Sequence, residues 1–145
     1  MHNLTPAVST RRVINATAAG TSDINGADID MTGYEGARCV VALGALTGTQ
    51  VTLLKAEEAD DNGSGAAGSY TAITGAATAA AADADSNKLL VLEVFRPKKK
   101  WLRFVVDRGT ANAVVDSGVA ELTRPSHQAT AQHSTVSQQK VLRGP

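Results

Sequence analysis

The sequence has little of what marks several classes of protein. Its one cysteine, Cys39, has no partner for a disulfide within the chain, so a disulfide-stapled secreted scaffold is not indicated. No apolar run approaches the roughly 20 residues of a membrane-spanning helix, and residues 1–12 lack the apolar stretch of a signal peptide. We therefore expect a protein that is made and used in the cytoplasm and does not contact a membrane.

Net charge is absent as well. Fourteen basic residues balance fourteen acidic ones, which removes the long-range field that draws a protein towards phosphate, so direct nucleic-acid binding is not expected. Aromatic residues make up only 3% of the chain although 43% of it is hydrophobic, so the core must consist mostly of Val, Leu and Ala. A chain of 145 residues fits one domain and can bury a self-standing core without disulfides or metals.

What the sequence does contain is a series of short runs rich in β-branched and apolar residues, separated by Gly, Asn, Asp and Pro. Such runs predict strands joined by turns. The predicted strands are residues 11–17, 27–31, 38–46, 50–58, 70–73, 88–95, 101–107 and 113–123. Strands of this length without long amphipathic helices predict an all-β fold, either a β-sandwich or a barrel. Periodicity leaves the jelly roll, the immunoglobulin-like order and other strand orders open.

Two features of these strands can be checked against a structure. Leu102, Phe104 and Val106 alternate along one strand, so they share a face that should be directed at the core. Residues 47–49 and 96–100 are short links between consecutive strands, which predicts that each of them closes a hairpin.

Composition divides the chain into three parts. Residues 1–10 are polar and aperiodic and predict an N-terminal arm. Residues 11–123 are expected to form the sandwich domain, with an excursion at 59–87 that is rich in Ala, Gly, Ser and Asp. Residues 124–145 are too polar to fold alone, so we expect an extended C-terminal arm that is either disordered or ordered by a partner.

A glycine-rich segment matches a dinucleotide-binding loop in its spacing. Gly63, Gly65 and Gly68 fit the pattern G-x-G-x-x-G. That motif works only where the third glycine opens a helix whose amides hold a pyrophosphate. The residues that follow predict a strand, so a flexible loop is the favoured interpretation.

Candidate metal and catalytic residues form incomplete sets. Asp83, Asp85 and Asn87 open a calcium-loop pattern, but its sixth position is Lys88 and its twelfth is Val94. The histidines lie in the predicted arms, which provide no rigid shell for a base or a ligand. They are His2, His127 and His133. We therefore expect no enzyme activity, no metal site and no cofactor.

The strongest local charge feature is the basic run at residues 96–100, which Trp101 follows. As a solvated hairpin turn, the run would discourage association at a sheet edge. As a functional feature, it would contact an acidic protein surface or nucleic acid, although a nucleic-acid platform would need more interleaved aromatic residues. The residues alone leave both interpretations open.

Several short blocks resemble small virion proteins of tailed bacteriophages. The blocks are residues 13–26 (VINATAAGTSDING), residues 85–88 with the strand after them, Phe95-Arg96-Pro97, and residues 106–116 (VDRGTANAVVD). The resemblance spans residues 11–123. Because this set of proteins includes head decoration, or cement, proteins with a jelly-roll fold, the resemblance implies a jelly roll for the sandwich domain.

The resemblance also implies a function. The chain would be a decoration protein on the outer surface of the virion capsid, a homo-oligomer (dimer or trimer) that binds the major capsid protein and reinforces the shell against DNA pressure. Arms at both ends would contact several subunits at once, and linked contacts multiply affinity. The candidate capsid-contact residues are Arg11, Arg12, Arg96, Lys98, Lys99, Lys100, Trp101, Arg124, Val136, Val141 and Leu142.

Two alternative functions are compatible with the same residues. The chain could be a tail or neck component of the virion, which would differ from a decoration protein in copy number. It could also be a carbohydrate- or receptor-binding module, for which Trp101, Tyr34 and Tyr70 are the candidate aromatic platforms.

Overall fold

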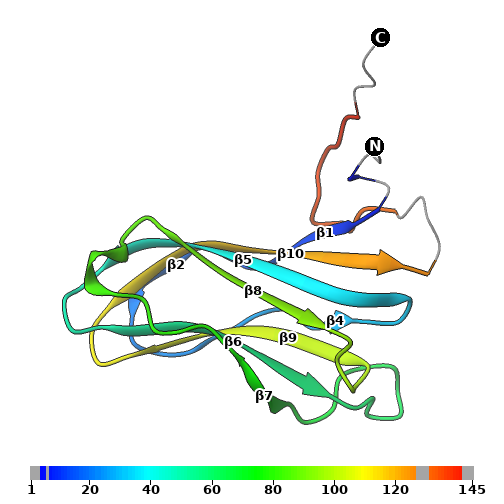
Figure 1. The fold of residues 1–145 in the computed structure, drawn as a ribbon, viewed down its shortest axis with the longest axis horizontal. Coiled ribbons are helices and arrows are strands. Elements are labelled where there is room, and N and C mark those ends of the chain that lie inside the picture. Colours follow the sequence, from blue (N-terminus) through cyan, green and yellow to red (C-terminus); the bar gives the residue numbers. More distant parts are fainter. Residues whose placement is uncertain (1–3, 6, 127–130, 142–145) are drawn as a thin grey trace.

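The protein is built almost entirely of β-strands arranged in two layers (Figure 1). The computed structural model describes residues 4–5, 7–126 and 131–141. Within these ranges lie ten strands and one short 3-10 helix. They are β1 (Ser9–Ile14), β2 (Thr17–Gly20), β3 (Ile24–Asn25), β4 (Ile29–Asp30), β5 (Tyr34–Leu46), β6 (Val51–Ala59), β7 (Thr71–Ala77), η1 (Asp83–Asp85), β8 (Leu89–Phe95), β9 (Trp101–Gly109) and β10 (Ala113–Pro125).

The strands form two antiparallel sheets. In sheet A the order is β1-β10-β5-β8, and β2 also pairs with β10. In sheet B the order is β3-β9-β6-β7, and β4 also pairs with β9. β1 and β2 are consecutive in sheet A, and β3 and β4 are consecutive in sheet B. From β5 onwards, each strand lies in the other sheet from the strand before it, except that β6 and β7 both lie in sheet B. This is the strand order of a jelly roll, and it confirms the predicted all-β sandwich.

Two short connections differ from the prediction. The sequence predicts hairpins at residues 47–49 and 96–100, but each of these segments crosses from one sheet to the other, because β5 and β8 belong to sheet A whereas β6 and β9 belong to sheet B. Facing sheets lie about 10 Å apart and consecutive Cα atoms about 3.8 Å apart. A link of this length therefore fits a hairpin and a crossing equally well, and its length could not decide between them.

The ends of several strands also differ from the predicted ranges. β1 begins at Ser9, inside the segment assigned to the N-terminal arm, and β10 continues to Pro125. Inside the excursion at 59–87, the strand predicted at 70–73 is present as β7, which extends to Ala77, and η1 is an additional element. The alanine-rich part of the excursion continues along β6, where the Ala81 N–H donates to Thr52 O (2.8 Å).

The core lies between the sheets and is mostly aliphatic. Leu102, Phe104 and Val106 are fully buried, as predicted. They pack in one cluster with buried side chains of sheet A, which include Ala37, Cys39, Val41, Leu43, Val115, Ala120 and Leu122. Among the described residues Phe104 supplies the only fully buried aromatic ring. No helix in this part of the chain has the length and hydropathy to cross a membrane.

Candidate functional site

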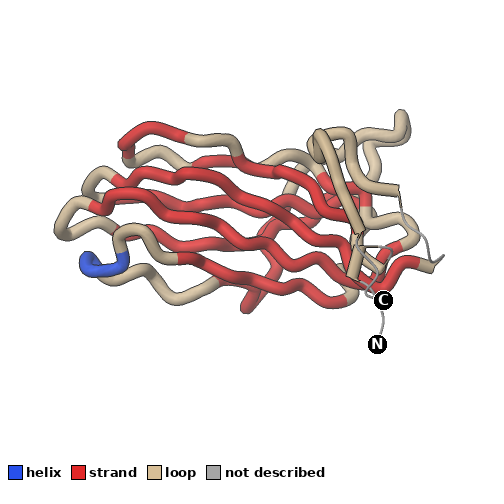
Figure 2. Tube along the Cα trace, turned by 90° about the horizontal axis from the view of Figure 1, so that it is seen from above, coloured by secondary structure: helices blue, strands red, loops and turns tan. Residues whose placement is uncertain are grey.

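One end of the sandwich brings the two arms and the basic connection together. β5 begins and β10 ends there, because Tyr34 pairs with Pro125, and β8 ends beside them at Phe95. β1 starts at the same end, since Ser9 pairs with Leu122. Figure 1 and Figure 2 show the described parts of the arms beside this end and η1 at the opposite one. We call it the arm end.

The arm end carries an exposed aromatic ring that two arginines contact. Phe95 is 51% exposed, and the guanidinium carbons of Arg96 and Arg124 each lie 5.0 Å from its ring centroid. Glu35 pairs with both arginines: its Oε1 lies 3.4 Å from Arg96 Nη2 and its Oε2 lies 3.7 Å from Arg124 Nη1. We call these four residues the Phe95 clamp. Aromatic and arginine side chains are enriched in the energetically dominant parts of protein interfaces.

Three neighbouring strands of sheet A bring the clamp residues together beside Gly36. Gly36 in β5 lies between Thr123 and Phe95 in the adjacent strands. A Cβ at Gly36 would lie 2.7 Å from Thr123 Oγ1 and 3.6 Å from Phe95 Cδ2, so the missing side chain leaves room for Thr123, and the Phe95 ring packs beside it. Arg96 and Arg124 have φ angles of 52° and 50°, a left-handed conformation that residues with a Cβ adopt only where their surroundings hold them.

Sequence reasoning did not identify Phe95 or Glu35 as contact residues. From the sequence, Phe95 is the end of a predicted strand and part of the block Phe95-Arg96-Pro97, and Glu35 lies outside the predicted strand at 38–46. One signal was present: an aromatic residue at the end of an apolar strand, followed directly by Arg96 and Pro97. The partners of that ring come from segments far apart in the chain, so sequence spacing could not assemble them.

The basic connection at 96–100 is largely neutralised by acidic residues that follow β6. Lys99 Nζ lies 3.0 Å from Asp60 Oδ2, and Lys100 Nζ lies 3.1 Å from Asp61 Oδ2. Two of its three lysines are therefore paired within the chain. The run is consequently not an open cationic patch, which removes support for a nucleic-acid contact at this place.

The backbone of the same connection is anchored as well. Glu58 Oε2 accepts hydrogen bonds from the backbone N–H groups of Lys98 (2.9 Å) and Lys99 (3.3 Å). The Lys98 side chain is exposed and makes no ion pair with any residue that the structure describes. Of the predicted basic contact residues in this run, Lys98 is thus the lysine whose charge is free to meet a partner.

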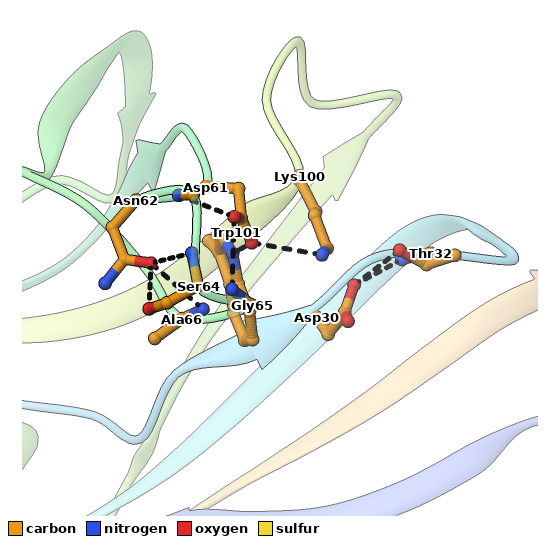
Figure 3. A network of polar contacts seen from close by, with 10 residues as sticks. Asp30, Thr32, Asp61, Asn62, Ser64, Gly65, Ala66, Lys100 and Trp101 are labelled. Carbon is orange, nitrogen blue, oxygen red and sulfur yellow. Dashed lines mark hydrogen bonds and ion pairs between the residues drawn. The ribbon is translucent and has the colours of Figure 1, made fainter.

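The glycine-rich loop after β6 is held by the carboxylate of Asp61 (Figure 3). Asp61 Oδ1 accepts hydrogen bonds from the N–H groups of Gly63 (2.8 Å) and Gly65 (3.2 Å). Its Oδ2 accepts from Trp101 Nε1 (3.2 Å) as well as from Lys100. One carboxylate therefore joins this loop to the start of β9.

Asn62 organises the rest of the loop in a similar way (Figure 3). Its Oδ1 accepts from Ser64 N (2.9 Å), Ser64 Oγ (2.7 Å) and Ala66 N (3.4 Å), and Gly68 N donates to Asp60 O (2.8 Å). Loop amides that a pyrophosphate would need are already bonded, and β7 follows instead of a helix. The G-x-G-x-x-G spacing therefore belongs to a surface loop here, as the favoured interpretation predicts, and hydrogen bonds within the chain occupy its amides.

Two of the aromatic rings considered for sugar binding already contact cations. Lys100 Nζ lies 5.3 Å from the ring centroid of Trp101, and Arg103 Cζ lies 4.1 Å from that of Tyr70. The Tyr70 hydroxyl donates to Asp28 Oδ1 (2.8 Å), and burial, followed by this hydrogen bond, raises the pKa of Tyr70. A sugar ring would have to displace these cations, so the two rings give the carbohydrate-binding alternative little support.

The described part of the C-terminal arm lies along β1. Gln132 Oε1 accepts from Thr10 N (2.8 Å), and Gln132 Nε2 donates to two carbonyl groups of the N-terminal segment (3.0 and 2.8 Å). Thr135 Oγ1 accepts from Arg12 N (3.0 Å). The two arms are therefore fastened to each other and to the edge of sheet A.

The other predicted contact residues in this region differ in exposure. Arg12 is exposed, whereas Arg11 is partly buried and desolvation lowers its pKa. Val136 and Leu4 line a cavity of about 190 Å³ between the arms and sheet A, and Val141 is 44% exposed. Three residues named in the sequence analysis lie outside the described residues: Leu142, His2 and His127.

Within the described ranges, no three His, Cys, Asp or Glu side chains come together as a metal site. The carboxylates of the partial calcium-loop pattern have local partners: Asp83 accepts from Thr49 N (2.9 Å) and Asp85 from Lys88 Nζ (2.8 Å). Cys39 is fully buried, and burial raises the pKa of its thiol to about 12. A thiol in this state is a poor nucleophile and a poor metal ligand.

Comparisons of this chain with protein-family models, with curated proteins and with solved structures found no match. The function proposed below therefore rests on the geometry of the arm end and on the resemblance of the sequence blocks to phage virion proteins.

The ionisation of Asp61 can be followed through Trp101, the one tryptophan of the chain. Hydrogen bonds from Lys100, then Trp101 and the loop amides, lower the pKa of Asp61 to about 2. A carboxyl group whose folded pKa is depressed contributes stability above its unfolded pKa of about 4, and that contribution is lost as the pH falls through the folded pKa. We expect the Trp101 indole N–H resonance to shift with a midpoint at a pH of about 2.

The matched control is Asp61→Asn, in which this titration of the indole resonance should disappear. A wild-type midpoint near the ordinary value for an aspartate would contradict the hydrogen bonds that fasten the loop.

Proposed function

We propose that this chain is a decoration protein of a tailed-bacteriophage head, which binds the outer surface of the shell and stabilises its major capsid protein. The observation that carries the proposal is the arm end, where both arms, Lys98 and the Phe95 clamp lie together. The jelly roll agrees with what the resemblance to phage virion proteins implies.

The Phe95 clamp is suited to anchor the protein on another protein. Its ring is already flanked by Arg96 and Arg124, so little side-chain freedom would be lost on docking. Two guanidinium groups against the single carboxylate of Glu35 leave a net charge of +1. The matching site on the shell would be an apolar pocket for the ring with an acidic residue at its rim.

The arms would supply further points of attachment. They are joined through Gln132 and project from sheet A at the arm end (Figure 1). Contacts that share one rigid body reinforce each other through effective concentration, even where each is weak. If the clamp and the arms dock on neighbouring capsid subunits, separating those subunits requires breaking both contacts, which is how a decoration protein would resist internal pressure.

The clamp yields a direct binding test. Replacing Phe95 by Ala removes the anchor, and loss of a central interface anchor costs about 2 kcal/mol or more, which is about 30-fold in affinity. We expect Phe95→Ala to bind shells of the major capsid protein about 30-fold more weakly in a cosedimentation titration. Its circular-dichroism spectrum should stay that of the wild type, because the ring is half exposed.

The control for this variant is Val51→Ala, at the opposite end of the sandwich, where the side chain is 43% exposed. Its affinity should stay within about twofold of the wild type, as expected for a residue outside the interface. Equal binding by Phe95→Ala and the wild type would show that the clamp is not the anchor.

Copy number separates the proposed function from the tail or neck alternative. Quantitative mass spectrometry of purified particles should find this chain in hundreds of copies, in a fixed ratio to the major capsid protein. A few to a dozen copies would instead place it in the tail or neck, and absence from the particles would rule out both assignments.

A further inference from the structure

A two-sheet sandwich has four edges, and one edge of sheet A is closed by the arm. Edge strands present rows of unpaired N–H and C=O groups that pair with other chains unless something covers or interrupts them. At β1, the side chains of Gln132 and Thr135 accept hydrogen bonds from the outward N–H groups of Thr10 and Arg12. The partly buried Arg11 adds a charge beside the same edge.

Both edges of sheet B are interrupted. One consists of β3 and β4, which have two residues each. At the other, the register of β7 against β6 shifts between Lys55 and Glu57, and Gly75 has a left-handed φ of 81°. Such a bulge bends the strand and breaks the row of backbone groups. Neither edge offers a long, straight template for pairing.

The remaining edge, β8, is a continuous strand, and it carries one charged side chain, Glu93. Its seven residues, LLVLEVF, include no Pro, Gly or Lys, and they pair with β5 without a register shift. Arg96 N donates to Glu35 O, and Lys88 O accepts from Leu43 N. These hydrogen bonds show that the even-numbered residues direct their backbone N–H and C=O groups towards β5. Because the direction alternates along an antiparallel strand, the odd-numbered residues direct theirs away from β5. These residues are Leu89, Val91, Glu93 and Phe95.

Apolar side chains accompany this open row. Leu89 is 60% exposed, Val91 43% and Phe95 51%, and together they are three of the six large hydrophobic side chains exposed in the described part of the chain. Val91 lies beside Val40 of β5, which lies beside Val119 of β10. The apolar surface therefore continues from the edge onto the outer face of sheet A.

We propose that β8 pairs antiparallel with β8 of a second copy of this chain, so that two A sheets become one continuous sheet. Charge complementarity favours a second copy as the partner. Asp83 precedes β8 and Lys98 follows it, and neither forms an ion pair with a described residue, whereas Asp85 is paired with Lys88 and Arg96 with Glu35. In an antiparallel pair the acidic start of each strand lies beside the basic end of the other. The zero net charge of the chain adds no overall repulsion between copies.

Side-chain chemistry also favours one register. Setting Glu93 opposite Glu93 of the second copy would bring two carboxylates together, which is destabilising. Setting Val91 opposite Val91 joins two exposed valines and separates those carboxylates. The residue chosen for the test, Val91, lies in the middle of β8, four residues before the clamp, so substituting it leaves the proposed capsid anchor unchanged.

The test is the mass of the free protein, measured by sedimentation velocity from micromolar to submillimolar concentrations. The wild type should form a dimer of twice 14.9 kDa. Val91→Lys should raise the dissociation constant at least about tenfold, since a lysine in mid-edge opposes pairing. Val51→Lys is the matched control, because Val51 and Val91 are both 43% exposed, and it should dimerise like the wild type.

A second readout avoids adding charge. Val91→Cys should form a disulfide-linked dimer on mild oxidation, whereas the wild type should not, because its Cys39 is buried. A monomer at every concentration would overturn the proposal and leave β8 for a different partner. A dimer that Val91→Lys does not weaken, or that Val91→Cys does not cross-link, would show that the copies meet elsewhere.

Discussion

The packing of β9 against sheet A is the contact on which the arrangement of the other elements depends. Leu102, Phe104 and Val106 are each fully buried, and burial of side chains of this kind stabilises a fold by about 1.5–3 kcal/mol apiece. β9 lies inside sheet B, with β3 and β4 on one side and β6 on the other. Because β9 starts at Trp101, the core contact also places the basic connection at the end where β8 and β10 finish.

The balance of charge is achieved locally as well as overall. Lys99 and Lys100 meet Asp60 and Asp61, and Glu35 bridges the two arginines of the clamp. Little long-range field is left to steer the protein towards a charged surface. Recognition by this molecule would therefore be short-range, through an exposed ring, the arms and an open sheet edge. The arm end and the edge of β8 meet at Phe95, the last residue of that strand.

The sequence was sufficient to predict a β-sandwich and to identify the face of β9 that lies in the core. Alternation along β9 identified the three core residues, and short β-branched runs located most of the strands. The sequence was insufficient to predict which strands pair with each other. The links at 47–49 and 96–100 are long enough either to turn back within one sheet or to cross to the other sheet. The jelly-roll order entered through the sequence resemblance, not through periodicity.

The candidate site was predictable only in part. The basic and arm residues near it were identified, but their pairing was not, since the acidic partners of the lysines come from a loop that composition marked only as an excursion. The Phe95 clamp needs two arginines with a left-handed backbone, which three strands bring together with the ring and Glu35. Such a combination depends on strand order, which a single sequence does not specify.

The central claim is that the arm end faces a protein shell. Electron cryomicroscopy of intact particles tests it most directly, because the sandwich is elongated and its two ends differ in outline (Figure 1). The account predicts jelly-roll density on the outside of the head, with Phe95 and the arms against the major capsid protein and η1 directed away from it. Density with η1 against the shell, or a head surface that lacks this chain, would contradict the account.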